Sequence, residues 1–224
     1  MKIVADSGYD LSPKQLGDQK IHTLPLKITL SSVNYRSGID IQPEEFYELL
    51  ATTEDMPTTS VPSPGEFLEL YEQVAQEDPD ILSIHISSGL SGTFNSARTA
   101  AEQMKNANIT LVDTRSLSGE MGWQIEAALQ GIKAGKNLQE ILETMTQVRN
   151  ASEIVFTLPD LSYLIHGGRI SHLKGLLASL LGIKPIIHVD KSDGKYADLA
   201  KARTFKKAIK AIPKYMSEKF NEGT

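Results

Sequence analysis

The chain has 224 residues, of which 40% are hydrophobic, and its formal net charge is −5. That length and apolar content suit one large domain or two small domains with a hydrophobic core. The sequence contains no Cys, which excludes disulfides, thiolate nucleophiles and zinc–thiolate sites and fits a reducing compartment. An early carboxylate at Asp6 argues against a signal peptide, and no stretch reaches the roughly 18 apolar residues of a membrane span. We therefore expect a cytoplasmic protein.

Short runs rich in β-branched residues alternate along the chain with amphipathic segments. This alternation is typical of an α/β fold with a largely parallel sheet. The expected strands are residues 2–6, 22–30, 81–86, 109–113, 153–158, 183–189 and 195–199. The last two should form a hairpin that turns at Ser192-Asp193-Gly194. The least regular stretch, residues 52–63, is expected to be a surface loop.

Two helix starts carry a capping box, in which the N-cap side chain and the side chain three residues later bond each other's backbone amides. Ser63 and Glu66 predict one such start, with a proline at the first helical position. Asn137 and Glu140 predict another, for a helix near 138–149.

Beyond residue 150 the helix signals are shorter. Gly167 is expected to close a short helix that begins at Pro159, and Ser171 to cap a helix over residues 172–181. Pro213 lies in an otherwise helical segment and should kink or end it.

The pattern of elements changes near residue 150, from regular alternation to glycines, short helices and a hairpin. We therefore predict two domains. Residues 1–150 should form a three-layer domain around a parallel sheet, and residues 151–224 a smaller α/β domain with a mixed sheet.

Charge is distributed unevenly. Residues 195–220 hold eight basic and two acidic residues, a net charge of +6 in an acidic protein. Such a run is usually a solvated helix face, and the alternative is a surface that docks an acidic partner. Nucleic acid is not an expected partner, because the chain as a whole is acidic, with a net charge of −5.

Four loops rich in Ser, Thr, Asp and Gly follow or adjoin the predicted strands. They are residues 6–8, 58–67, 87–93 and 113–119. Ligands of parallel α/β sheets bind beyond the carboxyl ends of the strands, where these loops converge. Each loop alone is more often a plain helix cap, so their convergence is what indicates a site.

The loop 87–93, SSGLSGT, leaves several chemistries open. It lacks the Gly-Lys-Ser/Thr of a phosphate-binding loop and the third glycine of a dinucleotide fingerprint. Its glycine is misplaced for a nucleophile elbow, although a serine hydrolase using Ser91, with His166 or His172 as base, remains an alternative. No His, Asp or Glu spacing predicts a metal.

The remaining interpretation is that the loop binds an anion without attacking it. Free amides at a helix start favour a carboxylate or a phosphate, and the hydroxyls of Ser91 and Thr93 add donors. Thr58, Thr59 and Ser60 offer a second set. A binder of a phosphorylated metabolite therefore also remains open.

Several ordered motifs are similar to those of a known family. They are Asp6-Ser7, the T-S-x-P-S-P of residues 59–64, the S-S-G-L-S-G-T-F-x-S-A of residues 87–97, the G-G-R-I-S of residues 167–171 and the I-K-P-I of residues 183–186. In this order, and over residues 1 to about 210, the chain resembles the DegV family of bacterial fatty acid-binding proteins.

The resemblance implies a non-catalytic protein, without cofactor or metal, that buries one long-chain fatty acid between its two domains. It implies that Thr59 and Ser91 hold the carboxylate, with Ser60, Gly92 and Thr93 completing the two loops. It further implies an ATP-dependent fatty acid kinase subunit as partner and a transient membrane contact. Arg169 matches a position linked to partner or membrane transfer, while a structural role on carbonyls of the glycine turn is the alternative.

Three departures from the family pattern are visible. Val61 stands where Gln is common, and His166 stands where an Arg often precedes the two glycines. The family's His-x-Gly-Pro-Gly segment, whose His joins the carboxylate network, has no counterpart before Thr224. We expect the apolar run 175–183 either to line the tail of the acid or to pack as ordinary core.

Overall fold

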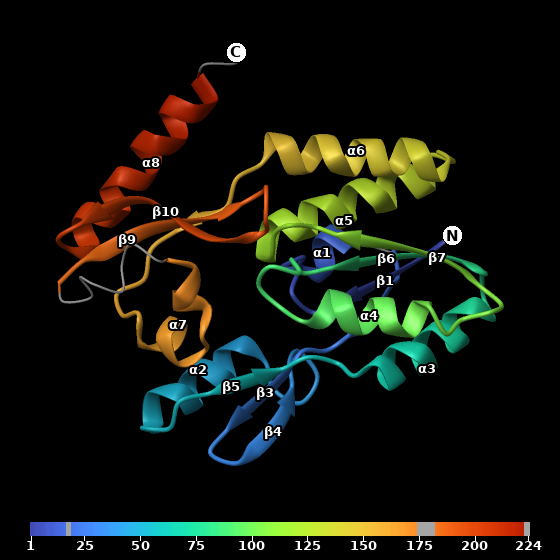
Figure 1. Cartoon of the computed structure of the whole chain (residues 1–224), viewed down its shortest axis with the longest axis horizontal. Helices are drawn as coiled ribbons and strands as arrows, with labels where there is room; N and C mark the ends of the chain where they lie inside the picture. The colour runs from blue at the N-terminus through green and yellow to red at the C-terminus, as the bar shows by residue number, and fades with distance from the viewer. Residues whose placement is uncertain (17–18, 174–181, 222–224) are drawn as a thin grey trace.

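A computed structural model describes residues 1–16, 19–173 and 182–221 and has an α/β architecture (Figure 1). Its centre is a four-stranded parallel sheet in the order β2-β1-β6-β7. The strands are β1 (Lys2–Asp6), β2 (Ile21–Leu24), β6 (Asp80–His85) and β7 (Asn108–Asp113). The expected parallel sheet is therefore confirmed.

Helices cover both faces of this sheet (Figure 1). They are α3 (Pro64–Ala75) and α4 (Thr93–Ala101) on one face, and α5 (Ser118–Lys133) and α6 (Leu138–Ala151) on the other. In β1, Ile3 and Ala5 pack toward α5 and α6, whereas Val4 packs toward α3 and α4. Successive side chains of a strand point to opposite faces, so a strand buried on both faces is apolar throughout. The predicted three layers are confirmed, and the short helix α1 (Pro13–Leu16) follows β1.

Both predicted capping boxes are present. The Ser63 hydroxyl accepts from the amide of Glu66 at 3.3 Å, and the Glu66 carboxylate accepts from the amide of Ser63 at 2.8 Å. Asn137 and Glu140 make the same reciprocal pair at 3.0 and 2.9 Å. Each cap contributes about 1 kcal/mol to helix stability.

The expected strand over residues 22–30 is wrong as a single element. The chain leaves the parallel sheet after β2, passes through Pro25, and enters β3 (Lys27–Leu30) of a second sheet. Pro25 has no amide hydrogen and cannot continue the ladder, while the Leu26 amide bonds the Ser7 hydroxyl at 2.9 Å instead.

This second sheet is antiparallel, in the order β4-β3-β5, with β4 (Val33–Arg36) and β5 (Thr58–Ser60) on either side of β3. Helix α2 (Pro43–Thr52) lies between β4 and β5 in the chain. The segment 52–63, expected to be loop throughout, therefore contains β5, in which Thr59 pairs with Ile28. Three exposed residues with no apolar alternation carry too little pattern to predict a strand.

The C-terminal part contains a third sheet in the order β10-β9-β8, formed by β8 (Val155–Phe156), β9 (Lys184–Asp190) and β10 (Lys195–Ala202). The predicted β9–β10 hairpin is confirmed, but both described pairings are antiparallel where a mixed sheet was expected. The helices of this part are α7 (Ser162–His166), the 3₁₀ helix η1 (Arg169–His172) and α8 (Phe205–Asn221). The predicted division near residue 150 falls at the end of α6 and stays a prediction.

Two helix expectations in this part need correction. Gly167 does close α7, but the helix begins at Ser162 rather than at Pro159. Helix α8 does not end at Pro213, because a proline removes only one amide donor and this one lies on an exposed side of the helix, while the alternative of a kink stays a prediction. Most of the predicted helix over 172–181 and most of the apolar run 175–183 lie outside the described residues. Within the described part, no helix is long and apolar enough to cross a membrane.

Helix α8 is tied to the rest of the molecule by Glu153, whose side chain is 4% exposed. One carboxylate oxygen pairs with the Lys219 ammonium, and the other lies 2.7 Å from Nδ1 of His188. Burial by itself raises the pKa of Glu153, but the hydrogen bonds from Lys219 and His188 outweigh it and hold the pKa below the ordinary glutamate value. The carboxylate therefore binds protons less readily in the folded protein than in the unfolded chain.

The lowered pKa of Glu153 predicts an acid-sensitive contribution to stability. It should be fully present above the ordinary glutamate pKa, about 4.3, and lost as the pH falls through the lowered folded value. Urea unfolding followed from pH 7 to pH 3 should therefore show a smaller loss of stability in Glu153→Gln than in wild type. Glu218→Gln, which removes an exposed pair with Lys214 on the same helix, is the control. Equal pH dependence in the two variants would contradict the assignment.

Candidate functional site

A single buried carboxylate organises the loops that leave the parallel sheet. Asp6, at the end of β1, accepts from the amides of Gly8 and Ile86, each at 2.9 Å. It also pairs with Nδ1 of His85 at 3.0 Å, and both side chains are fully buried. The loops after β1 and β6 are therefore fixed relative to one another, as groups bonded to one buried anion must be.

The network continues from His85 away from the loops. Nε2 of His85 lies 2.7 Å from the Ser83 hydroxyl, which lies 2.7 Å from the Tyr71 hydroxyl. Burial raises the pKa of Tyr71 to about 12, which keeps its hydroxyl protonated. The order serine–histidine–aspartate is that of a hydrolase triad, yet Ser83, His85 and Asp6 are all 0% exposed. No substrate reaches Ser83, so His85 has a structural role in this network.

The loop between β6 and α4 folds back on itself. The Ser87 carbonyl accepts from the amides of Leu90 and Ser91, both at 3.0 Å, and the Ser88 hydroxyl donates to Asp113. Helix α4 begins at Thr93, whose hydroxyl lies 2.8 Å from that of Ser91 and whose amide donates to Ser91 Oγ at 3.3 Å. The hydroxyl of Ser91 is thereby bonded to the first residue of helix α4.

A cavity of about 610 Å³ opens in front of this loop. That volume lies within the range of ligand pockets, about 300–1,000 Å³. Its walls combine apolar side chains with hydroxyls, aromatic rings and two basic side chains. The lining residues are Leu26, Ile28, Phe46, Pro57, Thr58, Thr59, Ser60, Val61, Ile86, Leu90, Ser91, Tyr163, Leu164, His166, Gly167, Arg169 and Tyr196. The cavity thus collects residues from the second sheet, the loop after β6, α7 and β10.

The predicted site residues divide among three positions. Thr59, Ser60 and Ser91 line this cavity together. Gly92 lines a smaller cavity of about 300 Å³ that shares Ser91 and Arg169 with the larger one. Thr93 is fully buried and lines neither cavity, so it reaches the site only through its hydrogen bonds with Ser91.

Residues at which the chain departs from the family pattern also face the cavity. Val61 and His166 both line it. Among the described hydrogen bonds, Ser91 pairs with Thr93 and makes none with His166. His166 therefore shares the cavity with Ser91 without a described hydrogen bond to it.

Arg169 bonds backbone carbonyls. Its Nε donates to the Leu90 carbonyl at 3.1 Å, and its Nη1 donates to the Gly167 carbonyl. The structural alternative that the sequence left open is thus realised, and the same side chain lines both cavities. Within the described residues, no group of three or more His, Asp and Glu could hold a metal ion.

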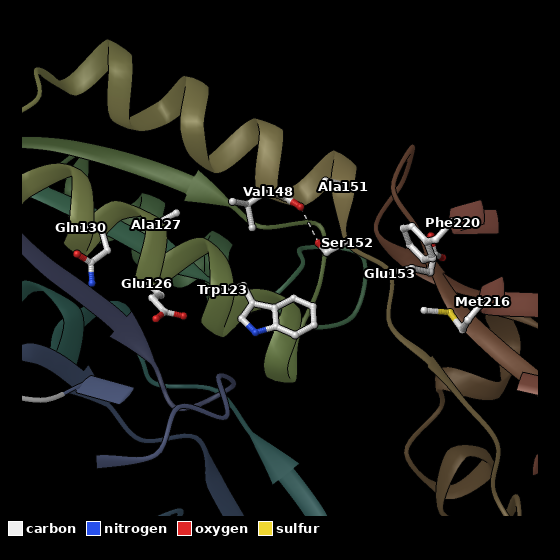
Figure 2. Close-up of a pocket in the computed structure, with 10 residues that line it drawn as sticks. All are labelled: Trp123, Glu126, Ala127, Gln130, Val148, Ala151, Ser152, Glu153, Met216 and Phe220. Atoms are coloured by element: carbon white, nitrogen blue, oxygen red, sulfur yellow. Dashed lines mark hydrogen bonds between the residues drawn. The ribbon is translucent and has the colours of Figure 1, made fainter. Parts of the chain in front are cut away.

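A second pocket, of about 560 Å³, was not predicted from the sequence (Figure 2). Figure 2 shows Trp123 of α5 on one side of this hollow and Met216 and Phe220 of α8 on the other. Its other lining residues include Glu126 and Glu153, and none belongs to the four hydroxyl-rich loops. The sequence carries no clear signal for this pocket, because the exposure of Trp123 is visible only in the structure. The larger cavity remains the candidate site.

A cavity that joins loop hydroxyls to largely apolar walls suits a ligand that has a polar and an apolar part. The chain belongs to the DegV family, whose family model matches residues 1–224. A DegV domain-containing protein of Staphylococcus aureus is 39% identical over 216 residues, which cover 96% of this chain and 76% of that protein.

Solved structures agree with this assignment. DegV from Bacillus subtilis, described as a fatty acid-binding protein, superposes with a TM-score of 0.90 at 31% identity, covering 99% of this chain and 78% of that one. A fatty acid-binding DegV family protein from Thermus thermophilus gives 0.85 at 32% identity, with 97% and 76% coverage. A stearic acid-binding protein from Eubacterium ventriosum gives 0.85 at 26% identity, with 99% and 78% coverage.

Proposed function

We propose that this protein binds one long-chain fatty acid in the larger cavity, with the carboxylate on Thr59 and Ser91 and the tail along the apolar walls. The observation that carries the proposal is that one cavity joins the hydroxyls of Thr59, Ser60 and Ser91 to a wall that includes Leu26 and Ile28. The binding properties described for related DegV structures support it.

The hydrogen bonds around Ser91 favour an acceptor in front of it. The Thr93 amide already donates to Ser91 Oγ, and the Thr93 hydroxyl can donate to the same oxygen. The Ser91 proton then remains for a ligand oxygen, because a hydroxyl has one proton to donate. The nine-residue helix α4 adds the positive end of its dipole behind this donor. A carboxylate completes this arrangement.

The tail supplies most of the affinity. The tail of a sixteen-carbon acid, buried at ~0.8 kcal/mol per CH₂, gains roughly 11–12 kcal/mol before the costs of association are subtracted. Hydroxyl contacts contribute a smaller amount and fix which end of the acid lies at Ser91. Head-group residues therefore set orientation, and wall residues set strength.

The proposal includes a carrier role. The protein presents its acid to a separate ATP-dependent kinase subunit that forms the acyl phosphate, and it exchanges the acid through a transient membrane contact. Arg169 faces both cavities beside the head group, which suits a residue at the exit side of the ligand. In this scheme the protein is a non-catalytic subunit.

The competing function is a serine hydrolase that uses Ser91. The observation in its favour is that His166 lines the same cavity. Covalent labelling of Ser91 by a fluorophosphonate, abolished in His166→Ala, would support it. Absence of labelling, together with a bound fatty acid, would support the carrier.

Organic extraction of the purified protein followed by mass spectrometry is expected to release one long-chain fatty acid per chain. Ile28→Trp should fill the cavity and abolish this yield, because Ile28 lines it. Val33→Trp, on the exposed side of the neighbouring strand, is the matched control and should retain the acid. A phosphorylated metabolite in the extract, or an empty wild-type protein, would overturn the proposal.

A further inference from the structure

The tip of the β9–β10 hairpin lies against the loop that carries Ser91 (Figure 1). The Ser87 hydroxyl donates to the Gly194 carbonyl at 2.7 Å, a buried contact between residues 107 positions apart. Beside it, the Arg115 guanidinium donates to the Ser192 carbonyl. The C-terminal sheet therefore reaches across to the edge of the parallel sheet through backbone carbonyls at this tip.

Two glycines permit this approach. A Cβ on Gly89 would lie 2.5 Å from the Asp193 carbonyl oxygen and 2.6 Å from that of Gly194. A Cβ on Gly194 would lie 2.0 Å from Ser87 Oγ, and its φ of +70° is itself unfavourable for other residues. The two backbones pack with no room for a side chain on either.

Ser87 links this contact to the proposed head-group site. Its hydroxyl accepts from the Gly89 amide at 3.2 Å while donating to Gly194, and its carbonyl accepts from the amides of Leu90 and Ser91. The loop therefore turns about Ser87, and the hairpin fixes the direction of that side chain. A shift of the tip would move the loop that positions Ser91.

The same half of the chain contacts the loop at a second point, where Arg169 donates to the Leu90 carbonyl. Tyr196, two residues beyond Gly194, lines the large cavity. One hairpin thus supplies both a wall of the cavity and a restraint on its hydroxyl loop.

We propose that the hairpin tip Ser192–Gly194 is a latch that holds loop 87–92 in the form that presents Ser91, so that retention of the acid depends on contact between the two halves of the chain. Gly194, Gly89 and Ser87 are then positioning residues. The latch rests on the proposed function only for its effect on ligand retention.

Gly194→Ala tests the latch, with Gly135→Ala as its control. Gly135 has nearly the same φ, +71°, but nothing within 4 Å of the added Cβ, so both variants carry the same backbone strain and one also has the clash. The protein is loaded with labelled palmitic acid and mixed with an excess of unlabelled acid. Gly194→Ala should then release its ligand about tenfold faster than Gly135→Ala, which corresponds to a barrier to release lower by about 1.4 kcal/mol. Equal release rates would overturn the proposal.

A double variant separates the contact from general damage. Ser87→Ala removes both the clashing hydroxyl and its hydrogen bond, so Ser87→Ala/Gly194→Ala should release palmitic acid no faster than Gly194→Ala alone. Additive effects of the two substitutions would count against a shared contact.

Hydrogen exchange tests the latch without ligand. In the ligand-free protein, the amides of Leu90 and Ser91 should lose protection in Gly194→Ala but not in Gly135→Ala, while the amides of Val4 and Ile84 in the central strands keep theirs. Unchanged protection of Leu90 and Ser91 would overturn the latch. If the wild-type protein binds no palmitic acid, the proposed function fails. Hydrogen exchange of Leu90 and Ser91 then decides by itself whether the hairpin tip holds the loop.

Discussion

Replacing Asp6 by alanine is expected to lower the free energy of unfolding by about 3–5 kcal/mol, as removal of one partner from a buried charged network does. The substitution leaves the buried His85 Nδ1, the buried amide of Ile86 and the partly buried amide of Gly8 without their acceptor. Each unsatisfied buried donor costs about 1–3 kcal/mol. Most of the expected loss therefore comes from the groups left behind.

Urea unfolding of Asp6→Ala measures this loss, and Asp55→Ala is the control. Asp55 is exposed, and its substitution should change stability by no more than about 0.5 kcal/mol. Asp6→Asn should also lower the stability of the fold, because its NH₂ group would face one of the donors that now bond to the carboxylate oxygens. An Asp6→Ala variant as stable as the control would show that the network contributes little to the fold.

Replacing Ser91 by alanine is expected to weaken retention of palmitic acid about 10- to 100-fold, the effect of losing a hydrogen bond to a charged group worth about 1.5–3 kcal/mol. The tail contacts remain, so the variant should still bind. The thermal midpoint of the ligand-free protein should stay near that of wild type, since Ser91 Oγ bonds only within its own loop and helix start among the described contacts.

Dissociation of labelled palmitic acid measures the effect of Ser91→Ala. Thr99→Ala is the matched control, because Thr99 lies on the same helix α4 and, within the described part of the chain, its hydroxyl bonds only the Asn95 carbonyl. Thr93→Val should show an intermediate effect, since it removes the hydroxyl that orients Ser91. Retention in Ser91→Ala equal to that in Thr99→Ala would remove Ser91 from the head-group site.

Local signals in the sequence predicted the elements whose causes are themselves local. The capping boxes at Ser63 and Asn137 are made by residues three positions apart, and the parallel strands are apolar because both faces are covered. The break at Pro25 was also local but was missed, because the apolar pattern continues through it. The short strand β5 depends on β3 for its hydrogen bonds, and nothing in its own three residues requires it.

The sequence could predict that Thr59, Ser60 and Ser91 lie together, but not the contacts that position their loops, and their role in binding stays a prediction. Hydroxyl-rich loops after strands pointed to Ser91 and Thr59, and the resemblance to the DegV family assigned them a role. The contact of Ser87 with Gly194 joins residues far apart in the chain, and no spacing rule predicts such a pair. The pocket in Figure 2 lies between α5, α6 and α8, and it too joins residues far apart in the chain that no spacing rule would bring together.

The break at Pro25 has a consequence for how binding properties are encoded. Strand β3 begins two residues after β2 of the parallel sheet, and Thr59 lies on β5, which pairs with β3. Ser91 lies in the loop after β6, another strand of the parallel sheet. Both hydroxyls therefore come from the first 92 residues, whereas Tyr163, Leu164 and Tyr196 of the wall come from after residue 160. If the proposed function holds, substitutions at these three wall residues would change which tail fits without replacing either of the hydroxyls that hold the carboxylate.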